Sequence, residues 1–430
     1  MAETGAAPPQ SSTSSPERIL TACCCVAGGG PAGMMLGLLL ARAGIDTVVL
    51  EKHGDFLRDF RGDTVHPSTL EVMDELGLID GFLKRPHQQL QRLAGEFGDE
   101  TVHIADFNHL AIKYPFVAFM PQWDFLDFLA DSARRYPSFR LLMRTEATDL
   151  IRSGETVTGV AARDAEGPLQ IRAALTVACD GRHSVLRARA KLAIEDIGAP
   201  IDVLWFKVHK DRDSEPVLAR VRAGRMMVTL DRGDYWQCAF VIAKGQFEAI
   251  RAKGLDAFRR AVAEVAPILA PYTGDIASWD DVKLLTVRID RLKRWTLPGF
   301  LCIGDAAHAM SPVGGVGVNL AVQDAVAAAN LLADKLAHGC PPETELDAVR
   351  RRRLWPTRLT QAIQVVVQNR ILKPALAASP GGVRPPFLIR VVNAWPWLQG
   401  QAARMVGLGV RPEHVRSPDA AAALDHAHGS

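Results

Sequence analysis

The chain has 430 residues, of which 48% are hydrophobic and 23% charged, and 50 basic against 48 acidic residues leave a formal net charge of +2. This composition is ordinary for a globular protein and excludes a disordered chain, a fibre and a coiled coil. The charge balance gives no reason to expect nucleic acid or an acidic membrane as the main partner.

The seven cysteines predict neither a disulfide framework nor a metal site. Cys23, Cys24 and Cys25 are adjacent, and neighbouring residues in a strand point to opposite faces. Reduced thiols and a cytoplasmic location are therefore expected. Residues 1–16 are small and polar, without a basic start or an apolar core, and predict a disordered tail instead of a targeting segment. The apolar runs fall short of the ~20 residues that span a bilayer, so no integral membrane segment is expected.

The first predicted elements are a strand, a glycine turn, a helix and a second strand. Residues 18–27 are a continuous apolar run, typical of a buried parallel strand, and GGGPAG follows at 28–33. A small-residue helix is expected over 34–43, and a strand over 47–50 ends at Glu51. This unit is typical of the start of a doubly wound α/β fold.

The glycine turn has the spacing of a dinucleotide-binding site. Gly28 permits a tight turn, Gly30 lets the backbone approach a pyrophosphate, and Gly33 lets helix and strand pack closely. The helix start offers free N–H groups and partial positive charge to phosphates. Glu51 lies 18 residues beyond Gly33 and can accept hydrogen bonds from ribose hydroxyls, which argues against a 2′-phosphate there.

The middle of the chain changes character along its length. Helices are predicted over 67–76 and 123–135, two strands around a turn at 153–155, and a core strand over 171–179. A set of strand-like runs with a helix near 255–269 then predicts an antiparallel sheet with helical cover. These runs cover 201–208, 217–222, 225–230, 235–243 and 284–289, after which the α/β pattern resumes at 300–303.

We therefore predict an α/β protein with a discontinuous Rossmann-like domain and an inserted antiparallel-sheet domain. The first domain would comprise residues 17–85, 115–195 and 285–345, the inserted substrate domain 86–114 and 196–284, and a helical C-terminal region 346–430. The four arginines at 350–353 are interpreted as an exposed helix face. The segment 387–410, with Trp395 and Trp397, is expected to pack over the core or to form a subunit contact, as in a homodimer, and membrane contact is the less favoured alternative.

A second glycine-rich loop begins at Gly304. Asp305 could accept a hydrogen bond from a ribityl hydroxyl, and the N–H groups of Gly317, Val318 and Asn319 could face the pyrimidine edge of a flavin. A helix N-terminus there would stabilise the negative charge of reduced flavin. The alternative is a glycine-rich loop with a buried Asp cap. His308 is interpreted as shaping this loop, in preference to acid–base catalysis.

Three motifs together resemble those of the class A FAD-dependent aromatic hydroxylases, which have the para-hydroxybenzoate hydroxylase fold. They are residues 28–33 with Glu51, the stretch from Cys179 to Arg187, and residues 304–321, within a resemblance that covers about 18–340. The resemblance implies bound FAD and gives Pro312 a positioning role beside the flavin ring. The cofactor-binding residues expected are Gly28, Gly30, Ala32, Gly33, Glu51, Lys52, Arg61, Gln122, Asp180, Gly304, Asp305, Pro312, Gly315, Gly317, Val318 and Asn319.

The resemblance further implies a monooxygenase reaction. NADH or NADPH would reduce the flavin transiently, O2 would form a C4a-hydroperoxide, and an apolar, aromatic small molecule would be hydroxylated in a dry pocket. One alternative is an FAD-dependent reductase or dehydrogenase, similar to the prenyl-chain reductases, that inserts no oxygen. Another is a flavoprotein retained for binding or scaffolding.

The inserted sheet is expected to cover the flavin and supply the substrate pocket. Either of its faces could line that pocket, because alternate residues of a strand point to opposite sides. Aromatic side chains in strands are also ordinary core residues. The pocket candidates are Trp205, Met226, Tyr235, Trp236 and Phe240.

Overall fold

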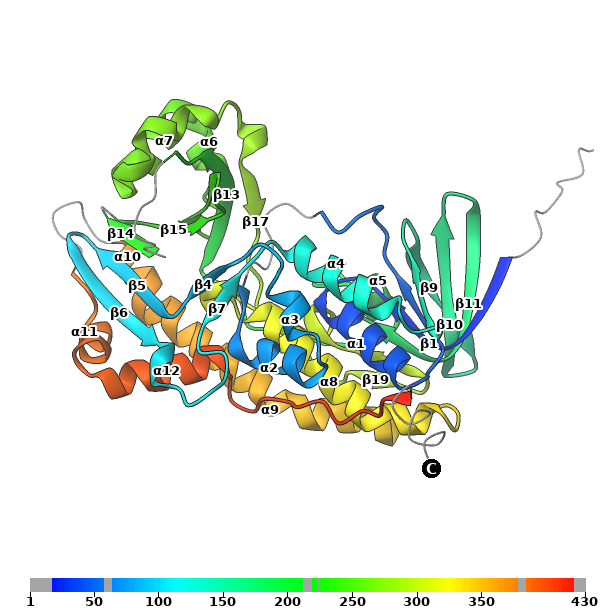
Figure 1. The fold of residues 1–430 in the computed structure, drawn as a ribbon. Coiled ribbons are helices and arrows are strands. Elements are labelled where there is room, and N and C mark those ends of the chain that lie inside the picture. The colour runs from blue at the N-terminus through cyan, green and yellow to red at the C-terminus, as the bar shows by residue number, and fades with distance from the viewer. Residues whose placement is uncertain (1–17, 58–63, 212–218, 223, 378–383, 421–430) are drawn as a thin grey trace, which may run out of the picture.

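The computed structural model describes residues 18–57, 64–211, 219–222, 224–377 and 384–420. Two large sheets lie beside each other, and long helices run beneath them (Figure 1). The predicted tail 1–16 lies outside the described residues. The predicted α/β class is confirmed.

The first sheet is built around β1, which pairs in parallel with β2 on one side and β11 on the other. β11 pairs in parallel with β20, and β8 in parallel with β2. β9 (Glu146–Ser153) and β10 (Thr156–Asp164) extend antiparallel from β11. The strands of the main path are β19 (Thr296–Leu297), β20 (Phe300–Cys302), β11 (Gly167–Ala178), β1 (Arg18–Ala27), β2 (Thr47–Leu50) and β8 (Phe139–Leu142).

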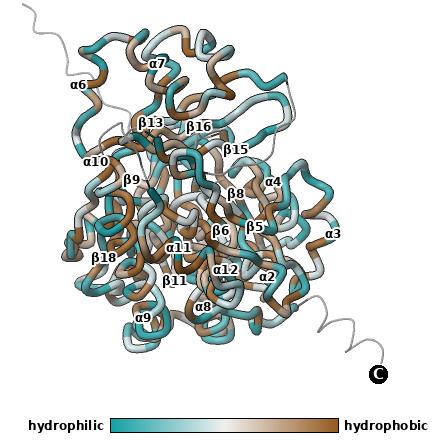
Figure 2. The backbone as a smooth tube through the Cα atoms, turned by 90° about the vertical axis from the view of Figure 1, so that its left-hand side faces the viewer, coloured by the Kyte–Doolittle hydropathy of each residue, from teal (hydrophilic) through white to brown (hydrophobic). Residues whose placement is uncertain are grey.

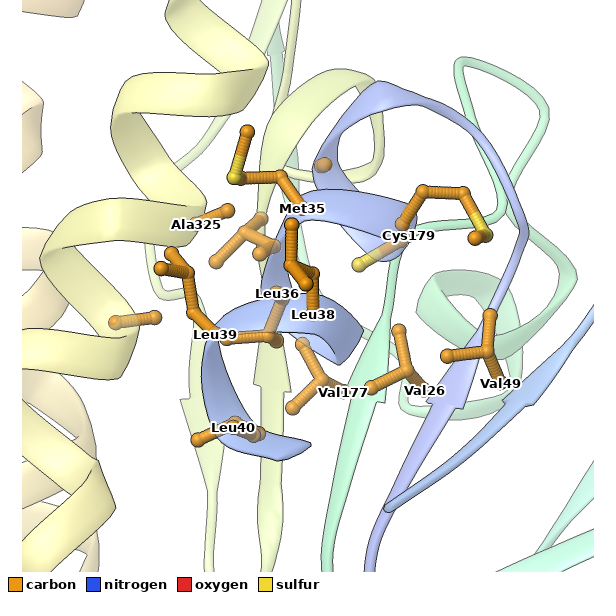
Figure 3. Packing of buried hydrophobic residues seen from close by; sticks show 14 of the residues in the cluster. Val26, Met35, Leu36, Leu38, Leu39, Leu40, Val49, Val177, Cys179 and Ala325 are labelled. Atoms are coloured by element: carbon orange, nitrogen blue, oxygen red, sulfur yellow. The ribbon is translucent and has the colours of Figure 1, made fainter. Parts of the chain in front are cut away.

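Two apolar helices, α1 (Pro31–Arg42) and α8 (Gly317–Leu336), pack against this sheet and each other. Figure 3 shows leucines of α1 against Val26, Val49 and Val177 of the strands and Ala325 of α8. Helix α1 lies close to β2 because Gly37 has no side chain. A Cβ atom at Gly37 would lie 2.6 Å from Cγ2 of Val49. Neighbouring α4 (Gln122–Ala133) packs on α1.

The second sheet combines two parts of the chain, and strands β8 to β11 of the first sheet lie between these parts in the sequence. Its pairs are antiparallel except for β14 with β5, which are parallel, so the predicted purely antiparallel sheet is mixed. Its order is β17 (Lys283–Leu285), β13 (Ile201–His209), β16 (Tyr235–Ala243), β15 (Arg225–Asp231), β14 (Ala219–Arg222), β5 (Arg92–Phe97) and β6 (Glu100–Asp106).

Two helices, α6 (Phe247–Ala252) and α7 (Leu255–Val265), lie at the β13–β16 part of this sheet. Hydrophobic and hydrophilic residues alternate along them in Figure 2, as expected for helices with one buried face. Short elements connect the two large sheets. They are β3 (Thr64–Val65), α2 (Pro67–Glu75), α3 (Ile79–Phe82), β4 (Gln88–Leu90), β7 (Val117–Phe119), α5 (Val185–Arg189), β12 (Ile194–Asp196), β18 (Asp290–Leu292) and β21 (His308–Ala309).

The C-terminal region is helical and runs back along the molecule (Figure 1). Its long helix α9 (Glu343–Val367) leads through a π turn into α10 (Lys373–Ala377), and α11 (Phe387–Ala394) and α12 (Pro396–Gly407) pack on β6. The chain then returns to α1, where Arg42 Nε lies 3.2 Å from Asp419 Oδ2.

Two expectations about apolar segments need correction. The segment Val313–Leu336, which includes α8, is long and apolar enough to span a membrane, although 78% of its apolar window is buried inside the protein. It is therefore the core helix of the first sheet. The helices of segment 387–410 pack on β6, but Trp395 and Trp397 themselves are exposed, so for these two side chains only the expected subunit contact stays a prediction.

Candidate cofactor and active site

Three loops that are distant in sequence meet at the end of the first sheet. A Cβ atom at Gly304 would lie 2.9 Å from Cβ of Ala32, so the Gly304–Asp305 loop touches the glycine turn before α1. A Cβ atom at Gly28 would lie 2.4 Å from the carbonyl oxygen of Cys179, which precedes Asp180. Ligands of open α/β folds bind at this edge, beyond the carboxyl ends of the strands.

The glycine turn combines close packing on one side with open space on the other. Gly28 has a φ of 111°, and a Cβ atom at Gly33 would lie 1.9 Å from the Gly28 carbonyl oxygen, so both positions require glycine. At Gly30 a Cβ atom would meet no heavy atom of the described chain within 4 Å. No side chain caps α1, which leaves the N–H groups of Ala32 and Gly33 available to a phosphate.

Glu51 anchors the glycine turn from the end of β2. Its Oε2 accepts a hydrogen bond from the N–H of Gly29 at 3.2 Å, and its Oε1 accepts one from the N–H of His53 at 3.0 Å. A carboxylate has about four acceptor positions, so these bonds leave capacity for the predicted ribose contact. Lys52 beside it has an exposed side chain.

Asp180, two residues after the end of β11, has one carboxylate oxygen without a partner among the described residues. Oδ2 accepts a hydrogen bond from the N–H of Leu186 at 3.1 Å, whereas buried Oδ1 has no partner among the described residues. Burial raises the pKa of Asp180. An unsatisfied buried acceptor needs an explanation, and a hydroxyl group of the cofactor fits that need.

The stretch from Cys179 to Arg187 and the loop that begins at Gly304 meet in an ion pair. Arg182 lies with its guanidinium 3.5 Å from Oδ2 of Asp305. The Asp305 side chain is partly exposed, so a ribityl hydroxyl can still reach its carboxylate. The residues present therefore fit a bound FAD at this position.

Helix α8 secures the second loop with a buried carboxylate that sequence reasoning missed. Oδ2 of Asp324 accepts hydrogen bonds from the N–H of Gly304 at 3.0 Å and from Nε2 of His308 at 2.6 Å. This agrees with the structural role expected for His308. On the other side, Nε of Arg353 in α9 donates to Oδ1 of Asp324 at 3.0 Å.

Arg353 corrects the interpretation of residues 350–353 as an exposed face. Its side chain is 1% exposed, and its guanidinium also reaches Glu413, 3.2 Å away. Burial acts to raise the pKa of Asp324, but the charges and hydrogen bonds of His308 and Arg353 outweigh it and leave that pKa below its ordinary value. A buried ion cluster thus joins α8, α9 and the C-terminal segment.

The same face of α9 holds the Pro312 loop. Nε2 of Gln364 donates to the carbonyl oxygens of Ser311 and Val313, each at 3.0 Å, and Oε1 of Gln364 accepts from the N–H of Ser311 at 3.1 Å. The signal in the sequence is a stripe of polar residues at helical spacing, all of them buried in the structure. The stripe comprises Arg353, Thr357, Gln361, Gln364 and Gln368.

The start of α8 is open where the flavin ring is expected. Among the described residues, nothing lies within 4 Å of a Cβ atom at Gly317 and no side chain caps the helix. The side chain of Asn319 points to α2 instead, where its Oδ1 accepts from the N–H of His66 at 2.9 Å and from Oγ1 of Thr69 at 2.7 Å. Only the backbone N–H groups of Gly317, Val318 and Asn319 remain candidates for flavin contact.

Three further residues were predicted to bind the cofactor: Gly315, Gln122 and Arg61. Gly315 has a φ of 63°, and its carbonyl oxygen accepts a hydrogen bond from Oγ1 of Thr64 at 2.8 Å. Gln122 is the first residue of α4 and is partly buried. Arg61 lies outside the described residues.

The two faces of the second sheet separate the pocket candidates. Trp236 and Phe240 belong to the core under α7, where the rings of Phe240 and Phe258 lie 5.5 Å apart, so they are core residues and not pocket walls. Trp205 and Met226 lie on the opposite face and share a cluster with Val313 of the Pro312 loop. Tyr235 precedes Trp236 in β16 and therefore also points away from the core.

Comparison with known proteins agrees with this geometry. The FAD binding domain family model matches residues 21–362. The 6-methylpretetramide 4-monooxygenase of Streptomyces rimosus is 30% identical over 90% of this chain and 92% of its own length. The 12-dehydrotetracycline 5-monooxygenase/anhydrotetracycline 6-monooxygenase of the same species is 29% identical over 73% of this chain. The dialkyldecalin synthase of Streptomyces rugosporus is 27% identical, also over 73% of this chain.

This chain covers 63% and 65% of the last two relatives, which are therefore longer proteins. Among solved structures, p-nitrophenol 4-monooxygenase from Pseudomonas putida matches with a TM-score of 0.72 and 20% identity, over 90% of this chain and 97% of that one. An anhydrotetracycline hydroxylase from Streptomyces rimosus matches with a TM-score of 0.68 and 24% identity, over 91% and 77%. The chain belongs to the FAD-binding class A flavin monooxygenases, and FAD is its cofactor.

Proposed function

We propose that this protein hydroxylates an apolar, polycyclic aromatic small molecule, with NADH or NADPH as reductant and O2 as the source of the inserted oxygen. The contact of Gly304 with Ala32 carries the proposal, because it supports a single cofactor site at which the starts of α1 and α8, both without a side-chain cap among the described residues, would meet the ligand. The first-mentioned relatives are named for pretetramide and tetracycline substrates, which supports the polycyclic class.

Bound FAD would supply the redox chemistry, in which the substrate, NAD(P)H, one proton and one O2 give the hydroxylated product, NAD(P)+ and water. The chain binds and orients the cofactor. The N–H groups of Ala32 and Gly33 hold its pyrophosphate, and Asp180 and Asp305 accept hydrogen bonds from its hydroxyls. The start of α8 stabilises negative charge at the edge of the ring.

Trp205 and Met226 would hold the substrate and exclude water from the reacting atoms. The support is their position on the sheet face that shares a cluster with Val313, next to the Pro312 loop. Pro312 positions the ring and substrate by the shape of its loop, which Gln364 holds in place. A dry site matters because water diverts the reaction to hydrogen peroxide.

The test is a screen of polycyclic phenols for stimulated NAD(P)H oxidation, followed by product mass spectrometry under 18O2. A product heavier by one 18O atom supports the proposal. A product heavier by two hydrogens would support the reductase alternative, and an isomer of unchanged mass would indicate ring formation, as the name of the dialkyldecalin synthase suggests for that relative.

We also propose a cytoplasmic location and a homodimer. The seven cysteines are all unpaired, which supports a reducing compartment. The homodimer stays a prediction, and light scattering of the purified holoenzyme measures it directly.

A further inference from the structure

Helices α11 and α12 carry a group of large apolar side chains that face solvent. Phe387 is 81% exposed, Trp395 63% and Trp397 69%. Leu388 and Met405 are also exposed, and we call these five residues the α11–α12 patch. Helices α11 and α12 lie at the end of the molecule onto which Figure 2 looks, beside the β5–β6 hairpin (Figure 1). Apolar side chains concentrated in this way mark an interaction surface.

The charged side chains that α11 and α12 themselves carry are both arginines, Arg390 and Arg404. Between Asp347 and Glu413 the sequence contains eleven arginine and lysine residues and no aspartate or glutamate. Arg390 in α11 and Arg404 in α12 are exposed, and neither forms an ion pair with a described residue. The net charge of the whole chain conceals this asymmetry, because the rest of the chain is acidic overall.

We propose that the α11–α12 patch docks this protein on the surface of an anionic lipid bilayer. Tryptophan is enriched at the level of the lipid headgroups, where its ring meets apolar chains and its N–H group meets water, and Trp395 and Trp397 are separated by one residue only. Phe387 and Leu388 supply apolar side chains that enter the acyl boundary, and the arginines attract acidic headgroups. The helices would lie in the interface and would not cross it, since α11 has 8 residues and α12 has 12.

A second copy of this chain is a poorer partner for the same patch. In a two-fold contact each residue of the patch meets the same patch of the other subunit. Arg390 and Arg404 would then be brought near the same patch of the other subunit, and neither α11 nor α12 holds an acidic residue to pair them. Like charges brought together in an interface are destabilising. An acidic bilayer, by contrast, supplies the missing negative charge.

The contacts of α11 and α12 with the rest of the protein support docking without rearrangement. Oδ1 of Asn393 in α11 accepts a hydrogen bond from the N–H of His103 in β6 at 2.7 Å. Buried Ile389 and Ala403 hold the two helices on their supports. The α11–α12 patch is thus a fixed surface that a bilayer can meet as it stands.

The test is co-flotation of the FAD-loaded full chain with large unilamellar vesicles. We expect binding to vesicles of phosphatidylcholine and phosphatidylglycerol (about 7:3) to be at least tenfold tighter than to phosphatidylcholine alone. Raising NaCl from about 0.1 to 0.5 M should weaken it, because exposed charges are screened. The double variant Trp395→Ala/Trp397→Ala should lose binding to both vesicle types by at least tenfold. The variant Arg390→Glu/Arg404→Glu should lose the preference for the acidic lipid.

Matched controls are Leu284→Ala, an exposed apolar residue of β17, and Lys253→Glu, an exposed charge after α6. Both should bind vesicles like the parent protein, and FAD content should be equal in all variants. Absence of flotation with acidic vesicles would overturn the proposal. So would a dimer that Trp395→Ala/Trp397→Ala converts to a monomer while vesicle binding is unchanged, since a second copy would then cover the patch.

Discussion

Arg353 and Asp324 form an ion pair in the interior, with Nε and Oδ1 3.0 Å apart and neither side chain more than 1% exposed. Asp324 also accepts the N–H of Gly304, which adjoins the predicted ribityl contact Asp305. The carboxylate of Asp324 therefore connects the guanidinium of Arg353 in α9 to the loop that begins at Gly304.

Replacing Arg353 with methionine should strongly destabilise the protein, because it leaves Asp324 buried without its arginine and removes one of the two arginines that pair with buried Glu413. Loss of one partner of a buried pair costs about 3–5 kcal/mol. Urea denaturation of the FAD-free protein measures this change. Arg351→Met, at an exposed position of the same helix, should change the free energy of unfolding by less than about 0.5 kcal/mol. Equal effects of the two variants would contradict the buried pair.

Gly30→Ala should weaken FAD binding without destabilising the FAD-free protein. A methyl group at Gly30 meets no atom of the described residues within 4 Å, so it projects into the space expected for the pyrophosphate. Gly33→Ala should instead unfold or destabilise the protein, because its methyl group would collide with the Gly28 carbonyl oxygen. FAD titration by fluorescence, together with thermal unfolding of both variants, separates the two effects. An FAD affinity of Gly30→Ala equal to that of the parent would argue against this placement.

Met226 and Met227 are neighbours that point to opposite faces of β15. Met227 is fully buried under α7, and Met227→Ala should cost about 2–5 kcal/mol of stability. Met226 lies on the face toward Val313, so Met226→Ala should mainly raise the KM for the aromatic substrate and increase hydrogen peroxide release. Denaturation curves and peroxide assays of the two variants give the comparison. A reversed pattern would mean that the substrate enters from the α7 side.

Stability should fall as the pH drops from about 6.5 to about 4, because of His66. Burial lowers the pKa of His66 from its ordinary value to about 4, although its hydrogen bond to the Val406 carbonyl oxygen at 2.7 Å opposes this. Below pH 6.5 the unfolded chain binds a proton that the folded chain does not, so stability is lost in this window, by at most about 3 kcal/mol. His66→Asn can keep the hydrogen bond and should flatten the curve between pH 4 and 6.5.

Asp324 should add a separate loss of stability in stronger acid. Its pKa is lowered in the folded protein, so its contribution is complete above the ordinary value near 3.8 and disappears as the pH falls through the folded pKa. Unfolding curves of parent and Asp324→Asn proteins between pH 2 and 4 measure it. The Asn variant should be less stable than the parent above pH 4, with the difference shrinking toward pH 2.

Local patterns were sufficient for the first sheet and its glycine turn. The apolar run of β1, the turn at 28–33 and the small residues of α1 each depend on near neighbours, and the helix begins at Pro31, three residues earlier than predicted. Contacts between elements distant in sequence could not be predicted from such local patterns. Alternation along β16 divided Tyr235 from Trp236 but could not show which side α7 covers. Arg353 resembled its exposed neighbours because burial depends on Asp324, 29 residues away.

The touching pair Ala32 and Gly304 constrains how the protein acquires its cofactor. During synthesis the glycine turn is complete long before the second loop emerges, and the whole second sheet lies between them in the nascent chain. Contacts between such remote segments form late in folding. The flavin therefore cannot template the early steps, and the emerging chain must fold its N-terminal strands and helix without that help.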